Sequence, residues 1–162
     1  MNMLWSWLLL ILMMLGCGPR TKDAEPESLK EEFAQPDHEV VIGMLVGKLR
    51  YDTEAFQVSS GSKVKLSLTN NDDVPHNWVL CDQGRDGMVA VVEASLELGE
   101  RAIKEQFIPK HRDLLIASKL LAKGEQQDLY FRAPSKHGDY HYVCTFPGHA
   151  AVMRGVMTVS AK

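Results

Sequence analysis

Alternating apolar and polar positions mark a series of short strands in the last three quarters of the chain. The clearest case is residues 63–69, where valine or leucine alternates with lysine, serine or threonine. A period of two indicates a half-buried strand, because successive side chains point to opposite faces of a sheet. Further apolar runs bounded by turn residues lie at 40–46, 56–58, 140–143 and 155–160. Such a series predicts an all-β sandwich with Greek-key connections.

Two other segments have patterns of their own. Residues 89–106 show apolar residues and Gly99 at intervals of three and four, with charged residues between them; the apolar ones are Val89, Val92, Leu96 and Ile103. This spacing predicts one amphipathic helix inserted into the β fold. Residues 114–121 and 128–132 flank a Lys-Gly-Glu turn at 123–125, and this arrangement predicts a hairpin.

The N-terminus has a different character. Residues 3–15 form an apolar run that, as a helix, would span about 20 Å against a hydrocarbon core of about 30 Å, so it is typical of a signal peptide. Residues 14–17, Met-Leu-Gly-Cys, resemble a bacterial lipobox, whose cysteine is lipidated. We therefore expect residues 1–16 to be a lipoprotein signal and Cys17 the lipidated N-terminus; an ordinary cleaved signal and an uncleaved anchor remain the alternatives. Gly18 favours the outer membrane, on the periplasmic side of the cell envelope.

Charge divides the remaining chain into a tether and a domain. Residues 18–37 carry six acidic and three basic side chains and almost no apolar ones, which predicts a flexible acidic tether over residues 17–37. Residues 38–162 carry 15 acidic and 15 basic side chains. A neutral domain argues against nucleic acid as a partner.

The richest chemistry lies near the C-terminus. Cys144, His149 and Met153 offer a thiolate, an imidazole and a thioether within ten residues, and Pro147 and Gly148 allow the segment to fold as a tight loop. Thiolate and thioether together select copper, and two histidines, one cysteine and a weak axial methionine are the ligands of blue-copper electron-transfer sites. The second histidine is His76, which stands at the head of an apolar strand after a polar turn.

The two ligand segments resemble those of a known family. Residues 76–80, His-Asn-Trp-Val-Leu, and 144–149, Cys-Thr-Phe-Pro-Gly-His, followed by Met153, are similar to the ligand segments of azurins and auracyanin-like cupredoxins. The resemblance covers most of residues 38–162. It implies a cupredoxin fold, one Cu(I)/Cu(II) per domain, and one-electron transfer between extracytoplasmic partners such as c-type cytochromes. It implies no enzymatic activity.

The same resemblance assigns residues around the copper. Asn77 is expected to donate its backbone N–H to the Cys144 sulfur and to bridge through its side chain to the Thr145 segment, which holds the ligand loops together. Pro75 departs from azurins, which have glycine before this histidine. An apolar patch around His149 is expected to be the docking surface for redox partners; it consists of Phe146, Pro147, Ala150 and Val152.

The other candidate ligands have simpler interpretations. With Cys17 bound to lipid and Cys144 to metal, Cys81 has no disulfide partner, and we expect it to be buried on the strand face opposite His76. Trp78 is expected to point inward and Met157 to be part of the core. Three histidines are interpreted as solvated and a fourth as facing away from the metal; they are His38, His111, His137 and His141.

The alternatives to electron transfer are copper delivery, a structural zinc site, a binuclear copper centre and a multicopper enzyme. A periplasmic copper-delivery lipoprotein is the main alternative, although four of the eight methionines lie in the signal. A structural zinc site would fit one cysteine and two histidines but would leave Met153 unexplained. A binuclear copper centre would need a second cysteine in the loop, and multicopper enzymes need further domains and histidines.

Overall fold

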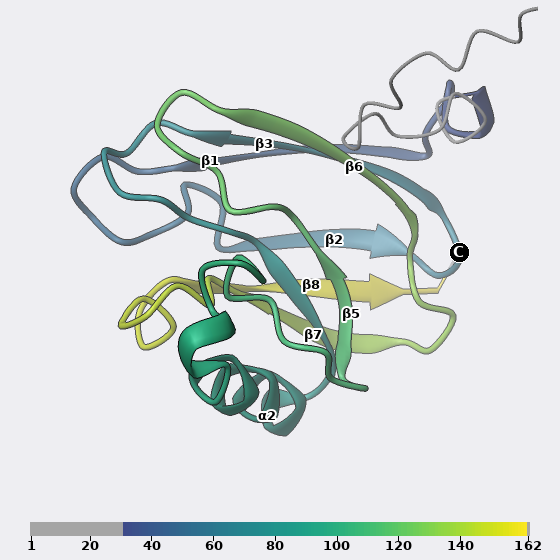
Figure 1. The fold of residues 1–162 in the computed structure, drawn as a ribbon. Helices are drawn as coiled ribbons and strands as arrows, with labels where there is room; N and C mark the ends of the chain where they lie inside the picture. Colours follow the sequence, from purple (N-terminus) through teal and green to yellow (C-terminus); the bar gives the residue numbers. More distant parts are fainter. Residues whose placement is uncertain (1–30, 162) are drawn as a thin grey trace, which may run out of the picture.

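Two β-sheets face each other in the computed structural model, which describes residues 31–161 (Figure 1). The three-stranded sheet has the order β1 (His38–Met44), β3 (Lys63–Asn70), β6 (Gln126–Arg132). The five-stranded sheet has the order β2 (Ala55–Ser59), β8 (Arg154–Ser160), β7 (Gly138–Val143), β4 (Val79–Gln83), β5 (Leu114–Ala117). The pairs β1–β3 and β2–β8 are parallel and the remaining pairs are antiparallel. The predicted all-β sandwich of the cupredoxin class is confirmed.

Alternation along the strands builds the core between the sheets. In β3 every second side chain is buried, beginning with Val64, and β8 shows the same pattern on its inner face. Trp78 is fully buried beside the rings of Phe131 and Tyr142, and Met157 lies in the same cluster. The inward positions predicted for Trp78 and Met157 are therefore confirmed.

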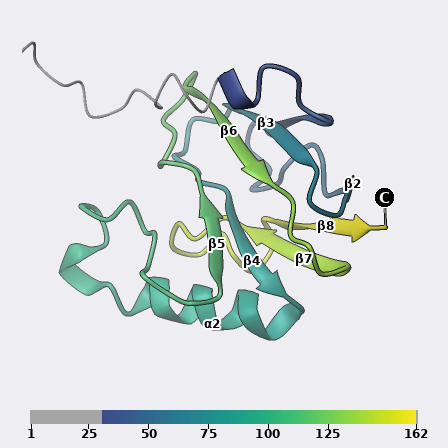
Figure 2. The ribbon, with the colours of Figure 1, turned by 90° about the vertical axis from the view of Figure 1, so that its right-hand side faces the viewer.

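A second, smaller core lies on the outer face of the five-stranded sheet. Helix α2 (Arg85–Leu96) covers this face (Figure 2), and Met88 and Val91 of the helix pack with Val79, Cys81 and Val143 of the strands. Cys81 is fully buried here. Its thiol thus belongs to the layer under the helix, on the face away from the main core.

The helix differs from the one that the sequence predicted. It begins at Arg85 and ends at Leu96, and the 3-10 turn η1 (Gly99–Arg101) follows, with its first residue, Gly99, at a φ of 54°. Glycine tolerates this left-handed conformation, so the chain turns where a longer helix would have continued. The predicted apolar face was also wrong, because Val89 is 42% and Ile103 83% exposed while Met88 and Val91 are buried.

The predicted hairpin of residues 114–121 and 128–132 is wrong as well. A turn does form at residues 122–125, where the Glu125 backbone N–H donates to the Ala122 carbonyl. However, β5 pairs with β4 in one sheet and β6 pairs with β3 in the other. The connection therefore crosses between the sheets, and Leu121 forms an isolated bridge with His76 on the way.

The segment before β1 is in contact with the domain from residue 31 onward. Phe33 is buried and its ring makes a tilted contact with that of Tyr130, and Glu32 forms an ion pair with Arg132. The expected solvated tether therefore does not extend to residue 37, because Phe33 supplies an apolar anchor. The predicted signal, Cys17 and the first part of the tether lie outside the described residues. Within residues 31–161 no helix is both long and apolar enough to cross a membrane.

Candidate metal centre

Three of the predicted ligands meet at one end of the sandwich. His76, Cys144 and His149 each offer one ligand atom, and these atoms lie within 4.8 Å of one another. His76 Nδ1 is 3.1 Å from His149 Nδ1, and the Cys144 sulfur is 3.9 Å and 3.6 Å from these two nitrogens. His149 is 6% exposed and the others are fully buried, as is Met153. Within the described chain this is the one such group of three or more candidate ligands.

The loop between β7 and β8 brings three of these side chains together. The Cys144 N–H donates to the Met153 carbonyl, and the Met153 N–H donates to the His149 carbonyl. These bonds close a compact loop in which Gly148 takes a φ of 84°, a left-handed conformation that suits glycine. The Cys, His and Met spacing seen in the sequence thus corresponds to a hydrogen-bonded loop that directs its side chains inward.

His76 is held by a different set of backbone bonds. Its N–H donates to the Leu121 carbonyl and its carbonyl accepts from the Leu121 N–H, so the residue is fixed on both sides. The side chain of Asn70, fully buried at the end of β3, donates to the carbonyls of Val74 and Leu121. The polar turn before His76 is therefore rigidly attached to the β5–β6 connection.

Asn77 and Thr145 join the two ligand segments directly. The Asn77 side chain donates to Thr145 Oγ1 at 2.8 Å, and its carbonyl oxygen accepts from the Thr145 N–H at 2.8 Å. Both residues are buried. Two reciprocal hydrogen bonds in an apolar environment resist separation of the segments, since a broken bond would leave a buried polar group unpaired.

Burial controls the electrostatics of the site. Burial raises the pKa of the Cys144 thiol to about 11, while backbone N–H groups of Asn77 and Phe146 at the sulfur act in the opposite direction. Burial, and then the neighbouring His76, lowers the pKa of His149. Both effects favour a neutral site in the metal-free protein. A metal cation that replaces the thiol proton would offset the cost of burying a thiolate.

The residue types fit a soft, redox-active cation. One thiolate, two imidazole nitrogens and a buried thioether match the donor set of blue copper, whereas zinc sites rarely use methionine. The Asn77 and Phe146 N–H groups are placed to share the thiolate charge, and hydrogen bonds to the sulfur are one means by which such proteins set their reduction potential.

Comparison with known proteins agrees with this chemistry. Residues 38–160 match the family model described as copper binding proteins, plastocyanin/azurin family. The chain belongs to this family. It is 33% identical over 123 residues to auracyanin-A of Chloroflexus aurantiacus, covering 75% of this chain and 74% of that protein. It is 29% identical over 120 residues to an azurin of Pseudomonas aeruginosa, covering 69% and 78%.

Solved structures of this family superpose on the fold. Reduced auracyanin from Roseiflexus castenholzii has a TM-score of 0.69 at 31% identity, covering 75% of this chain and 96% of that one. Auracyanin A has a TM-score of 0.68 at 30% identity. The predicted likeness to azurins and auracyanins and the predicted copper cofactor are confirmed, and His76, Cys144, His149 and Met153 form the ligand cluster typical of a type 1 copper site.

Sequence reasoning missed two contributions to the site. Asp72 is 2% exposed, and its Oδ2 lies 3.1 Å from His76 Nε2. Gln106 and Phe107 both adopt positive φ, and their carbonyls accept hydrogen bonds from Asn77 and Thr145. Non-glycine residues rarely take this conformation, so a turn at the end of the predicted helix could not be read from the sequence.

The remaining histidines lie outside the ligand cluster. His137 is exposed, as expected, whereas His38 is partly buried and accepts a hydrogen bond from the Ser59 N–H. His111 is also partly buried and accepts from the Asp113 N–H, so neither is fully solvated. His141 lies on β7 and lines a pocket with Met88 of α2, away from the cluster. These positions leave His76 and His149 as the two imidazole donors.

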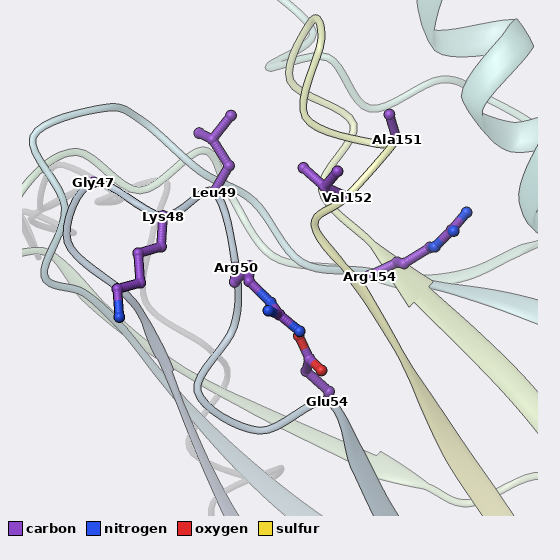
Figure 3. Close-up of a pocket in the computed structure, with 8 residues that line it drawn as sticks. All are labelled: Gly47, Lys48, Leu49, Arg50, Glu54, Ala151, Val152 and Arg154. Carbon is purple, nitrogen blue, oxygen red and sulfur yellow. The ribbon is translucent and has the colours of Figure 1, made fainter.

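A groove runs beside the metal-binding loop. It has a volume of about 640 Å³, between the β1–β2 loop and the start of β8, and Figure 3 shows Leu49 and Val152 on its two sides. Arg50 pairs with Glu54 in the groove. Lys48 and Arg154 are exposed and have no ion pair among residues 31–161. The groove next to the copper loop thus carries positive charge that the neutral composition of the domain does not reveal.

Proposed function

We propose that this chain is a mononuclear blue copper protein that carries single electrons between redox partners outside the cytoplasm. The observation that supports this most directly is the buried convergence of His76, Cys144 and His149 with Met153. Copper bound there would supply a one-electron Cu(II)/Cu(I) couple. We propose no catalytic role for this chain.

The protein's own part is to keep the ligands fixed during electron transfer. His76 is held on both sides by Leu121, and the Asn77–Thr145 pair connects its segment to the cysteine loop. Donors held in this way before the metal binds cannot adapt fully to the preferred geometry of either oxidation state. We expect a small structural change on reduction and fast exchange as a result.

Electrons are proposed to pass through the edge of His149, the ligand with a small exposed fraction. Pro147 and Val152 beside it are exposed, and Phe146 and Ala150 are partly buried. Phe146 is fixed by an edge-to-face contact with Phe107. Partners such as c-type cytochromes would dock on this patch in short-lived complexes with a small interface. Lys48 and Arg154, in the adjacent groove, place positive charge beside this apolar patch.

Colour and reversible redox cycling test this proposal. The full chain loaded with one equivalent of Cu(II) is expected to show intense visible absorption, which arises from charge transfer between the Cys144 thiolate and the metal. Cys144→Ser should abolish this band, whereas Cys81→Ser should keep it, because Cys81 lies under α2. A wild-type protein that stays colourless with copper bound would contradict the carrier function and would favour copper delivery, the alternative that needs no reversible couple.

Attachment to the cell envelope is the second part of the proposal. The lipobox-like Met-Leu-Gly-Cys sequence at residues 14–17 supports lipidation of Cys17 and a periplasm-facing site at the outer membrane. Mass spectrometry of the native protein would detect the lipid directly. Cys17→Ser should release the protein from the membrane fraction or leave it unprocessed, and an unmodified mature chain that begins at another residue would reject lipidation.

A further inference from the structure

A buried carboxylate lies behind the ligand His76. Asp72 is 2% exposed, and its two oxygens have separate roles. Oδ1 accepts the backbone N–H groups of Gly47 at 2.9 Å and Asp73 at 2.8 Å. Oδ2 lies 3.1 Å from His76 Nε2, and among residues 31–161 no other donor is bonded to it. A buried carboxylate oxygen needs a donor, so this contact is best satisfied when the His76 proton is on Nε2.

This contact decides which nitrogen of His76 can bind a metal. A neutral imidazole with its proton on Nε2 has its lone pair on Nδ1. His76 Nδ1 is the atom that faces the cluster, 3.1 Å from His149 Nδ1 and 3.9 Å from the Cys144 sulfur. The carboxylate therefore selects the form of His76 whose free electron pair points at the copper position.

The loop around Asp72 is built to keep this carboxylate in place. The Asp72 N–H donates to Asn70 Oδ1, and the Asn70 amide is itself bonded to the carbonyls of Val74 and Leu121. Gly47, which donates to Oδ1, belongs to the β1–β2 loop that lines the groove in Figure 3. Three chain segments thus converge on a single buried anion.

We infer that Asp72 is a positioning residue for the copper site: it fixes the tautomer and orientation of His76, and its negative charge favours Cu(II) over Cu(I). The inference rests on the proposed copper-binding function. A carboxylate behind a histidine ligand raises the basicity of that ligand, and loss of such a partner typically costs 10–100-fold in metal affinity. A buried anion stabilises the more highly charged metal state, so it lowers the reduction potential.

Asp72→Asn tests both the effect on the His76 tautomer and the effect of the charge on the potential, with little change in side-chain shape. The amide oxygen is expected to replace Oδ1, because two backbone N–H groups point at it, so the NH₂ group would face His76 Nε2. That arrangement favours the proton on Nδ1, the atom that should bind copper. We expect Cu(II) affinity to fall about 10–100-fold. Cu(I) affinity should fall less; a tenfold difference between the two losses corresponds to a rise of about 59 mV in potential.

Asp73→Asn is the matched control. Asp73 is the next residue, its side chain is 71% exposed, and it pairs with Lys123 rather than with a ligand. This variant removes the same charge without touching His76, so its copper affinity and potential should stay within about twofold of wild type. Equal affinities and potentials in Asp72→Asn and Asp73→Asn would overturn the inference and leave Asp72 as a loop anchor only.

A measurement on the unmodified protein remains decisive if Asp72→Asn does not fold. Nitrogen-15 NMR of the metal-free wild type should show His76 with its proton on Nε2, and a proton on Nδ1 instead would overturn the inference. This readout needs no metal. It is therefore separable from the proposed function, which fails if the wild type binds copper without colour or does not bind it.

Discussion

Met153 is the ligand whose replacement should change the potential and spare the site. It is fully buried in the loop after β7 and its N–H is bonded to the His149 carbonyl. Met153→Leu removes a weak axial donor while it keeps the side-chain volume close to native. We expect copper and colour to be retained and the potential to rise on the order of 59 mV, which is a tenfold change in the preference for Cu(I). Voltammetry and visible spectra measure this; complete loss of copper would show that Met153 is a primary ligand.

Cys81 should be inert although it is a free thiol. Burial raises its pKa to about 12, and it lies in the core under α2. In the native protein Cys81 should therefore resist alkylation by iodoacetamide at pH 8, and peptide mapping should find the label on Cys81 only after denaturation. Rapid labelling of Cys81 in the folded protein would contradict its placement.

The raised pKa of Cys81 also predicts how the stability of the fold changes with pH. The Cys81 pKa is about 8.5 in an unfolded chain and higher in the folded one. Its contribution to stability is fully present below about pH 8.5 and is lost as the pH rises toward about 12. Urea unfolding between pH 7 and 11 should thus show a steeper alkaline loss for wild type than for Cys81→Ala.

At the level of single residues, the sequence was informative where ligand chemistry is local. Cys144, His149 and Met153 are close in sequence, so their types and spacing were enough to predict one site. Asp72 was not found, because a carboxylate in a polar turn looks like a solvated one. Its burial depends on Gly47 and the Asn70 network, which only the folded chain brings near.

Among the elements, helix α2 offers a sharp test of the observed packing. Met88 is buried against the outer face of the five-stranded sheet, whereas its neighbour Val89 is 42% exposed. Met88→Ala should lower the free energy of unfolding by about 2–5 kcal/mol. Val89→Ala should change it by less than about 0.5 kcal/mol. Chemical denaturation of both variants measures this, and the reverse order would support the helix face that the sequence pattern predicted.

The two errors in the predicted elements, the long helix and the hairpin, have one cause. Residues 89–106 and the pair 114–121 and 128–132 were each interpreted as continuous local units. In the structure the first is interrupted after Leu96, with positive φ at Gly99 and Gln106, and the two strands of the second belong to different sheets. Periodicity identifies which residues face a core, but the choice of partner strand depends on long-range contacts that the pattern does not contain.

For the whole molecule, the uneven charge of the surface predicts which reagents exchange electrons fastest. Lys48 and Arg154 carry positive charge beside the exposed Val152, and Ala151, in the metal-binding loop, lines the same groove. Ala151→Glu should slow oxidation of the reduced protein by the anion hexacyanoferrate(III) and should leave the copper spectrum unchanged. The rate for wild type should fall as salt rises, since screening weakens the attraction.

The control for this experiment lies at the other end of the sandwich. Ser135 is exposed in the connection between β6 and β7, and Ser135→Glu adds the same charge far from the copper loop. Its rate with hexacyanoferrate(III) should stay near the wild-type value. If both variants react equally fast, electrons leave the protein elsewhere and the patch around His149 is not the port.

The contact of Phe33 with Tyr130 determines where on the domain an N-terminal tether would be attached. It fixes the N-terminal segment beside the ends of β3 and β6 where Lys63 and Arg132 lie, whereas the Cys144 to Met153 loop is at the other end of the strands (Figure 1). A tether through the residues before β1, whether to a lipid layer or to an electrode, would therefore be attached at the end of the sandwich opposite the metal-binding loop. The point of attachment would then lie away from the ligand cluster, so the tether would leave the face around His149 accessible to mobile electron carriers.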